Sequence, residues 1–238
     1  MGLWAQLALD MDRHRAVTLV GGGGKTSLMY ALAHEARAAD RTVIVTTSTH
    51  ILPHPRLLLT DDPDPAHLRA CLSEHGILTL GARSKENKLC GVGEIRLCKE
   101  AASVVVIEGD GAKFLPLKVP ADHEPVIPPD SDAVIAVAGM DSVGQPIGAV
   151  CHRPERVCCL LDKPMDALVT WEDVAAILAS PQGGRKGVLP TVAFRCALNK
   201  AELNPQAARS IARRLKDQGI PAAVTSFRAE ERGGLCWF

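Results

Sequence analysis

The stretch that decides the fold runs Val17-Thr18-Leu19-Val20-Gly21-Gly22-Gly23-Gly24-Lys25-Thr26-Ser27. A short apolar run, typical of a buried strand, leads into four glycines. The apolar residues that follow fall on one face of a helix, at Leu28, Met29, Leu32, Ala33 and Ala36. The sequence therefore predicts a strand, a glycine-rich loop and an amphipathic helix in immediate succession.

This loop has the chemistry of a phosphate-binding site. Glycines let backbone amides point towards a polyphosphate, and the N-terminus of the following helix favours anions. A lysine adds charge at the outer phosphates, and a Ser or Thr hydroxyl holds Mg²⁺. The spacing fits a short G-x-x-G-K-T form, since the longer form would need glycine where Leu19 stands. The predicted nucleotide contacts are Gly21, Gly22, Gly23, Gly24, Lys25, Thr26 and Ser27.

Further apolar runs indicate a mostly parallel sheet. They span residues 42–46, 103–107, 133–137, 191–198 and 222–225, and they are apolar on both faces, as a sheet covered by helices requires. Thr170 with Asp173 resembles a capping box, and Asn204 followed by Pro205 is a helix start. We predict one domain over residues 1–238, a P-loop NTPase-like three-layer α/β sandwich. A small β-hairpin insert is expected around residues 77–98, with a polar turn from Ser84 to Lys88.

Composition and charge exclude several classes of protein. The chain has 238 residues, with 27 basic and 27 acidic side chains, so its formal net charge is zero. This balance argues against a general nucleic-acid binder and against a polybasic membrane-surface protein. The absence of a long apolar run and of a basic, apolar leader predicts a cytoplasmic protein. The eight cysteines contain no CxxC pair and are expected to be reduced thiols.

Two strand ends carry candidate metal and catalytic groups. Residues 104–107 form an apolar strand, and Glu108 and Asp110 follow at its carboxyl end, where ligands bind in open α/β sheets. One carboxylate is expected to hold Mg²⁺ together with Thr26, and the other to orient the attacking water. Hydroxyls follow residue 45 in a row, and Thr47 is a further candidate for the metal. Lys25, Glu108 and Asp110 are thus the predicted catalytic residues.

A third motif bears on the base of the nucleotide. Asn199, Lys200 and Glu202 resemble the N-K-x-D signature that reads guanine, with glutamate in place of aspartate. Glutamate has the same acceptor group on a longer side chain, so the motif leaves ATP and GTP both open.

Taken together, these motifs resemble the YqeC-type family of selenium-dependent hydroxylase accessory proteins. The resemblance rests on the glycine loop, on residues 45–49, and on Glu108-Gly109-Asp110-Gly111-Ala112-Lys113. It continues through residues 115–118, 123–128, His152-Arg153-Pro154-Glu155 and residues 198–200. Departures from the family pattern are Gly109 for alanine, His50 for lysine and Glu202 for aspartate.

The resemblance implies a nucleotide-binding protein that assists maturation of a molybdenum hydroxylase, with that enzyme or its maturation factors as partner. The residues add Mg²⁺-dependent binding of ATP or GTP and slow hydrolysis. Lys113 and Arg153 are candidates for contacting phosphate or a second anionic ligand, and Lys118 and His123 for lining the same face. Two alternatives stay open: an ATP-dependent small-molecule ligase or kinase with a Mur-ligase-like loop, and a nucleotide sensor or scaffold. A homodimer is compatible with the sequence.

Overall fold

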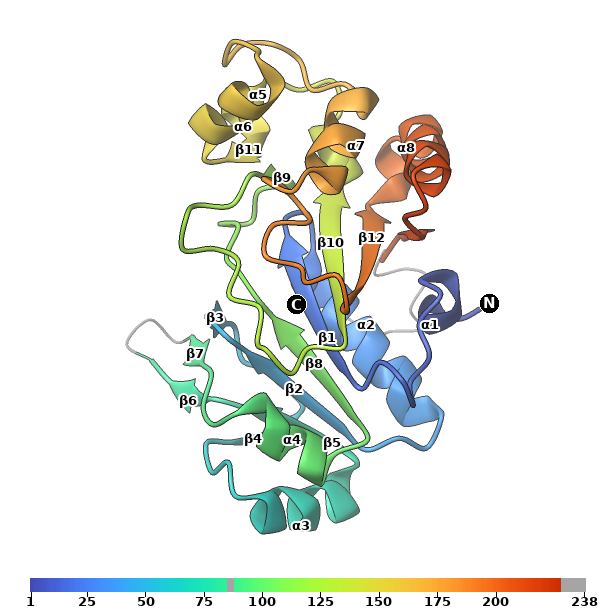
Figure 1. Cartoon of the computed structure of the whole chain (residues 1–238). Coiled ribbons are helices and arrows are strands. Elements are labelled where there is room, and N and C mark those ends of the chain that lie inside the picture. The colour runs from blue at the N-terminus through green and yellow to red at the C-terminus, as the bar shows by residue number, and fades with distance from the viewer. Residues whose placement is uncertain (85–87, 228–238) are drawn as a thin grey trace.

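A parallel eight-stranded sheet forms the centre of the molecule (Figure 1). The computed structural model describes residues 1–84 and 88–227. The strand order is β13-β12-β10-β1-β8-β2-β5-β4, and all of these neighbours pair in parallel. The strands are β1 (Ala16–Gly21), β2 (Val43–Thr47), β4 (Leu58–Thr60), β5 (Ile77–Leu80), β8 (Val104–Glu108), β10 (Ala133–Gly139), β12 (Ala193–Asn199) and β13 (Ala222–Val224).

Helices cover both faces of this sheet and make three layers. One face packs against α1 (Leu3–Gln6) and α2 (Lys25–Ala38). The other face packs against α3 (Pro65–His75) and α4 (Ile95–Ala101) over β2, β5 and β8, and against α7 (Trp171–Ala179) and α8 (Pro205–Asp217) over β10 and β12. The predicted fold class is confirmed.

The alternation of β10 shows why its residues had to be apolar throughout. Ile135 and Val137 pack into the core beneath α2, whereas Val134 and Ala136 pack into the core beneath α7 and α8. All four are at most 1% exposed. Because full burial of a Val or Ile side chain contributes roughly 1.5–3 kcal/mol, burial of this strand on both faces contributes strongly to the stability of the sheet.

The predicted insert is partly wrong. Ile77–Leu80 was expected in it, but this segment is β5 and pairs with β2 in the main sheet. The hairpin itself is β6 (Ala82–Arg83) with β7 (Leu89–Cys90), and β7 also pairs with β3 (His50–Ile51). The middle of the expected polar turn, residues 85–87, lies outside the described residues. A four-residue apolar run does not by itself reveal its partner strand, which explains the error.

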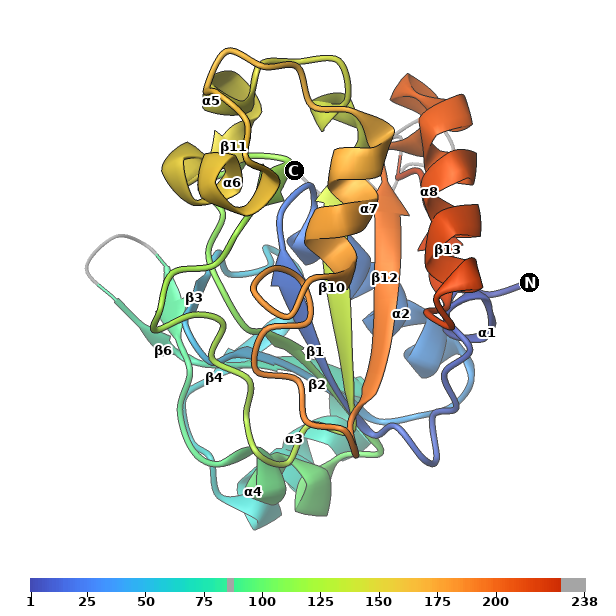
Figure 2. The same cartoon turned by 45° about the horizontal axis from the view of Figure 1, so that its top comes forward.

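A second group of small elements lies beside α7 near the carboxyl end of β10 (Figure 2). Here β9 pairs in parallel with β11. The group and the two short 3-10 helices are β9 (Leu117–Lys118), β11 (Cys151–His152), α5 (Ile147–Val150), α6 (Pro154–Leu161), η1 (Met140–Ser142) and η2 (Ala201–Leu203).

The predicted helix starts are confirmed by their hydrogen bonds. Thr170 accepts from the amide of Asp173 and the Asp173 carboxylate accepts from the amide of Thr170, which is a complete capping box. Asn204 caps α8 by accepting from the amide of Ala207. None of the helices in the described ranges combines the length and the apolar character needed to cross a bilayer.

Candidate phosphate-binding site

The glycine loop joins the carboxyl end of β1 to the start of α2. Three of its amides donate hydrogen bonds to the protein itself: Gly21 to the Asp110 carboxylate (3.0 Å), Gly22 to the Val137 carbonyl (2.9 Å) and Gly23 to the Leu115 carbonyl (3.1 Å). These amides were expected to face a ligand. In the structure they instead fasten the loop to the surrounding strands and turns.

The amides that remain for a ligand begin at Gly24. The first bond of α2 runs from the Leu28 amide to the Gly24 carbonyl, and no side chain caps this end. The amides of Lys25, Thr26 and Ser27 precede that bond and have no acceptor within the helix. Free amides at a helix N-terminus, together with the positive end of the helix dipole, favour anions, so this end of α2 is a candidate anion site.

Two loop positions require glycine for reasons of space. Gly23 has φ +75°, and a Cβ there would lie 2.1 Å from the amide nitrogen of Gly139. Gly24 has φ +106°, and its Cβ would lie 2.3 Å from Nδ2 of Asn199. The loop is therefore packed closely against the carboxyl ends of β10 and β12.

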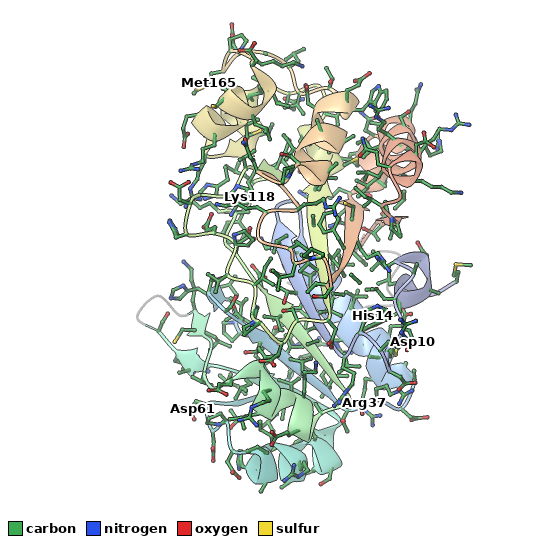
Figure 3. The ribbon with its side chains drawn as sticks, viewed as in Figure 1. Asp10, His14, Arg37, Asp61, Lys118 and Met165 are labelled. Carbon is green, nitrogen blue, oxygen red and sulfur yellow. The ribbon has the colours of Figure 1, made fainter. Side chains whose placement is uncertain are left out.

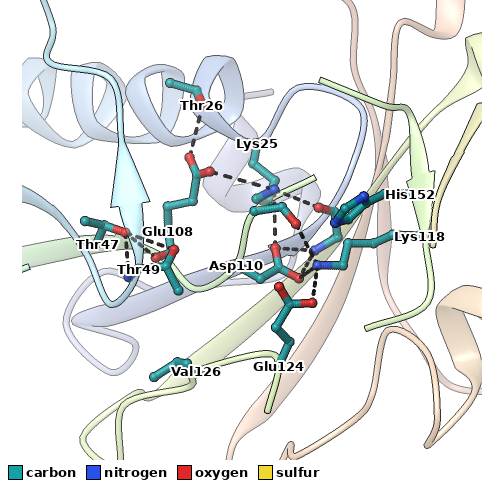
Figure 4. A network of polar contacts seen from close by, with 12 residues as sticks. Lys25, Thr26, Thr47, Thr49, Glu108, Asp110, Lys118, Glu124, Val126 and His152 are labelled. Carbon is teal, nitrogen blue, oxygen red and sulfur yellow. Dashed lines mark hydrogen bonds and ion pairs between the residues drawn. The ribbon is translucent and has the colours of Figure 1, made fainter. Parts of the chain in front are cut away.

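The Thr26 hydroxyl and the Glu108 carboxylate lie together in front of this helix end, so that their oxygens could both bind one metal ion (Figure 4). Thr26 donates from its hydroxyl to Oε2 of Glu108 at 3.0 Å, and Nζ of Lys25 lies 3.8 Å from Oε1. Burial raises the pKa of Glu108, and the opposing pull of Lys25 and Thr26 only partly offsets it. A hydroxyl and a carboxylate beside a phosphate site are donors that suit Mg²⁺, so the residues present fit this ion.

Asp110 does not share this position. It is 1% exposed, and besides the Gly21 amide its carboxylate lies 3.3 Å from Nζ of Lys25 and 3.0 Å from Nζ of Lys118. Glu108 lines the cleft in front of the loop, whereas Asp110 lies behind it. The carboxylate expected to bind metal or orient water thus holds the loop and two ammonium groups.

The chain of buried charges continues away from the loop. Lys118 lies at β9, between the main sheet and the α5–α6 group (Figure 3), and its Nζ contacts Glu124 at 2.9 Å. Glu124 also pairs with Arg153 at 3.0 Å, and Arg153 contacts His152 at 2.7 Å. Burial alone would raise the pKa of Glu124, but Lys118 and Arg153 hold it below its usual range. Arg153, a candidate for contacting phosphate, is therefore committed to a carboxylate.

Thr47 was a further candidate for the metal. Its hydroxyl donates to the Glu108 carbonyl at 2.9 Å and accepts from the Thr49 amide. The hydroxyl residues that line the cleft from this strand end are instead its neighbours Ser48 and Thr49.

The N-K-x-E stretch lies outside the cleft. Nδ2 of Asn199 donates to the Gly23 carbonyl at 2.8 Å, and Oδ1 accepts from the Thr225 hydroxyl at 3.1 Å. Lys200 forms an ion pair with Asp141, and Glu202, whose side chain also has a partner, is not among the lining residues. Asn199 thus ties the end of β12 to the glycine loop.

A cleft of about 880 Å³ opens in front of the loop. One wall is Gly23 to Thr26. The other walls come mostly from the segments that follow β2 and β8, and Ser84 and Lys88 of the β6–β7 hairpin complete the lining. The cleft includes Lys113 and His123, as the sequence indicated, and adds Phe114, Leu115 and Val126, which were assigned no role at the site from the sequence. Their signal was position alone, because all of them follow strand β8, whose carboxyl end meets the loop.

Comparison with known proteins settles the family. The model of the family described as YqeC protein matches residues 17–155. The chain is also 30% identical over 193 residues to "Uncharacterized protein YqeC" of Escherichia coli (strain K12). This match covers 76% of this chain and 75% of the relative. The chain belongs to the YqeC family. None of the solved structures matches it.

The segment that matches the YqeC model contains most of the site. It ends at residue 155 and includes Lys25, Thr26, Glu108, Asp110 and Lys118. The N-K-x-E stretch lies beyond it. The glycine loop and the buried charges behind it thus lie within the part of this chain that matches the family model.

Proposed function

We propose that the protein binds a nucleoside triphosphate, ATP or GTP, together with Mg²⁺ and hydrolyses it slowly. The observation that carries the proposal is the arrangement at the start of α2. Open amides, the Lys25 ammonium and the Thr26–Glu108 pair all meet at the inner end of one cleft. Each of these groups interacts with phosphate or with its metal ion.

The residues would divide the work as follows. The amides from Gly24 to Ser27 and the Lys25 ammonium bind the oxygens of the outer phosphates. Thr26 and Glu108 would hold Mg²⁺, which neutralises charge on the phosphates when it is bound. Burial disfavours the ionised form of Glu108 and raises its pKa despite Lys25 and Thr26, so a bound cation would favour the ionised carboxylate.

Asp110 and Lys118 have a positioning role in this proposal. Asp110 holds the Gly21 amide and the Lys25 ammonium in place, and Lys118 compensates the remaining charge of Asp110. Lys25 also donates to the Gly21 carbonyl at 2.7 Å, so its ammonium lies across the loop that it would serve. A polyphosphate would meet a lysine that is already positioned.

The first prediction concerns Lys25→Ala. Removing a charged hydrogen-bond donor costs about 1.5–3 kcal/mol, so the Kd for Mg-ATP and Mg-GTP should rise roughly 10- to 100-fold. Calorimetry on the purified protein measures this, with Lys216→Ala on the exposed face of α8 as the matched control. Glu108→Gln should slow phosphate release and weaken the dependence on Mg²⁺. Unchanged nucleotide affinity in Lys25→Ala would refute the site.

The proposal extends to maturation of a molybdenum hydroxylase that carries a labile selenium or sulfur ligand, a role supported by the family resemblance alone. Nucleotide binding would then control association with the client enzyme. Its test is co-purification from the native host with and without nucleotide. Retention of the hydroxylase by wild type and by Lys25→Ala to the same degree would exclude nucleotide control.

A further inference from the structure

The cleft extends well beyond the groups that would hold phosphates. Lys25, Thr26 and Glu108 occupy its inner end, but most of its lining comes from the segments after β2 and β8. We call this second part the outer cleft and define it by Ser48, Thr49, His50, Lys113, Phe114 and His123. A nucleotide whose terminal phosphate rests at Lys25 would leave this space beside that phosphate.

The outer cleft offers hydrogen-bond donors that the fold does not use. In residues 1–84 and 88–227, the side chains of His50, Lys113 and His123 make no hydrogen bond or ion pair. Besides Glu108 at the inner end, Glu124 is the one carboxylate among the described residues that line the whole cleft, and it follows His123 in the chain. It does not neutralise them, because Lys118 and Arg153 pair with it from behind.

Lys113 is also held next to the glycine loop by an unusual turn. Lys113 and Phe114 both have left-handed backbone angles, with φ +47° and +63°. The next carbonyl, that of Leu115, accepts the hydrogen bond of the Gly23 amide. Two consecutive non-glycine residues in this region are strained, and such strain clusters at ligand sites. The turn ties the Lys113 ammonium and the exposed Phe114 ring to the loop.

We propose that the outer cleft binds a second small molecule, an anion bearing a carboxylate or phosphate group, next to the terminal phosphate of the nucleotide. Lys113 and His123 recognise the anion, and Ser48, Thr49 and His50 line the same cleft. This inference deepens the proposed function and rests on the nucleotide site, since the glycine loop that would bind the phosphates lines the same cleft.

The test uses the full chain saturated with Mg²⁺ and a non-hydrolysable ATP analogue. Inorganic phosphate is titrated in one arm and malonate in the other, and binding is followed by calorimetry. At least one of the two should bind, and Lys113→Ala/His123→Ala should weaken it at least tenfold while the analogue's Kd stays within twofold. Lys216→Ala should change neither. No binding of either anion, or equal binding in the double variant, overturns the proposal.

A second arm separates this inference from the proposed function. If the analogue fails to bind wild type, the nucleotide site is wrong, and the anions are then titrated onto nucleotide-free Lys25→Ala. Binding there that is lost when Lys113→Ala/His123→Ala is added supports the outer cleft. Binding that is absent, or unchanged by the added substitutions, overturns it. Comparison of the Kd for inorganic phosphate with the Kd for malonate tells whether the site prefers a phosphate or a carboxylate.

Discussion

At the scale of single residues, Glu108 and Asp110 differ in their ion pairs. Asp110 is enclosed between the ammonium groups of Lys25 and Lys118, whereas Glu108 lines the cleft. Asp110 and Glu124 both form ion pairs with Lys118, whose side chain is 1% exposed. Breaking a buried ion pair leaves the other charge uncompensated, which costs more than the pair itself contributes. Lys118 therefore ties Asp110, and through it the glycine loop, to the segment that carries Glu124.

A prediction at this scale concerns Glu124→Gln. The pKa of Glu124 is lowered in the folded protein, so its ionised form stabilises the fold above the ordinary value of 4.5, and this is lost as pH falls through the lowered pKa. The variant should lose about 1.5–3 kcal/mol of unfolding free energy at pH 7. Urea unfolding measures it, and the difference from wild type should shrink below about pH 4.

The control for that prediction is Glu155→Gln on the exposed side of α6, which should change stability by less than about 0.5 kcal/mol. A stability difference between wild type and Glu124→Gln that persists unchanged into acid would contradict the assignment of this ion pair.

At the scale of elements, the glycine loop is held by neighbours from three directions. The end of β10 contributes the Val137 carbonyl, the turn before β9 contributes the Leu115 carbonyl, and the end of β12 contributes Asn199. Loops that are fixed in this way need little reorganisation when a ligand binds, and that preorganisation favours affinity.

The prediction for this scale is that Asn199→Ala weakens ATP and GTP alike. The variant loses the hydrogen bond to the Gly23 carbonyl, worth about 0.5–1.5 kcal/mol, so each Kd should rise roughly two- to tenfold. Thr225→Val, which removes only the bond to Oδ1 of Asn199, should have a smaller effect. A loss confined to GTP would show instead that Asn199 reads the base.

At the scale of the whole molecule, the site is built from the middle of the sheet. The loop follows β1, Glu108 ends β8, and these two strands are neighbours at the centre of the strand order. Strands β1 and β8 contribute side chains to the cores on both faces of the sheet. A ligand that binds only the folded protein at their ends should therefore raise its stability against unfolding.

This coupling gives the last prediction. At a free Mg-nucleotide concentration of 100 times Kd, binding contributes about 2.7 kcal/mol, which for a chain of this size raises Tm by roughly 5–11 °C. Lys25→Ala at the same concentration, which is only about 1–10 times its own raised Kd, should lose roughly half of the shift or more. Scanning calorimetry checks both. An equal shift in the two proteins would mean that the nucleotide binds elsewhere.

Much of the fold and part of the site follow from local pattern. The runs at residues 103–107 and 133–137 predict buried strands because every residue except Ser103 is apolar. The Thr170 and Asn204 caps depend on neighbours only three residues away. The glycine loop is recognisable for the same reason. The strand Ile77–Leu80, which pairs with β2 on one side and β4 on the other, could not be placed, because β2 lies about thirty residues earlier in the chain.

The sequence by itself determined a parallel α/β sheet, a phosphate-type loop with Lys25 and Thr26, and two acidic residues at the carboxyl end of β8. Only the tertiary structure decided that Glu108 faces the cleft while Asp110 supports the loop from behind. It likewise decided that Asn199 holds Gly23. The reason is physical: a carboxylate's role depends on which cations and amides lie around it, and Lys118 reaches Asp110 only because residues 109–118 turn back beneath the loop.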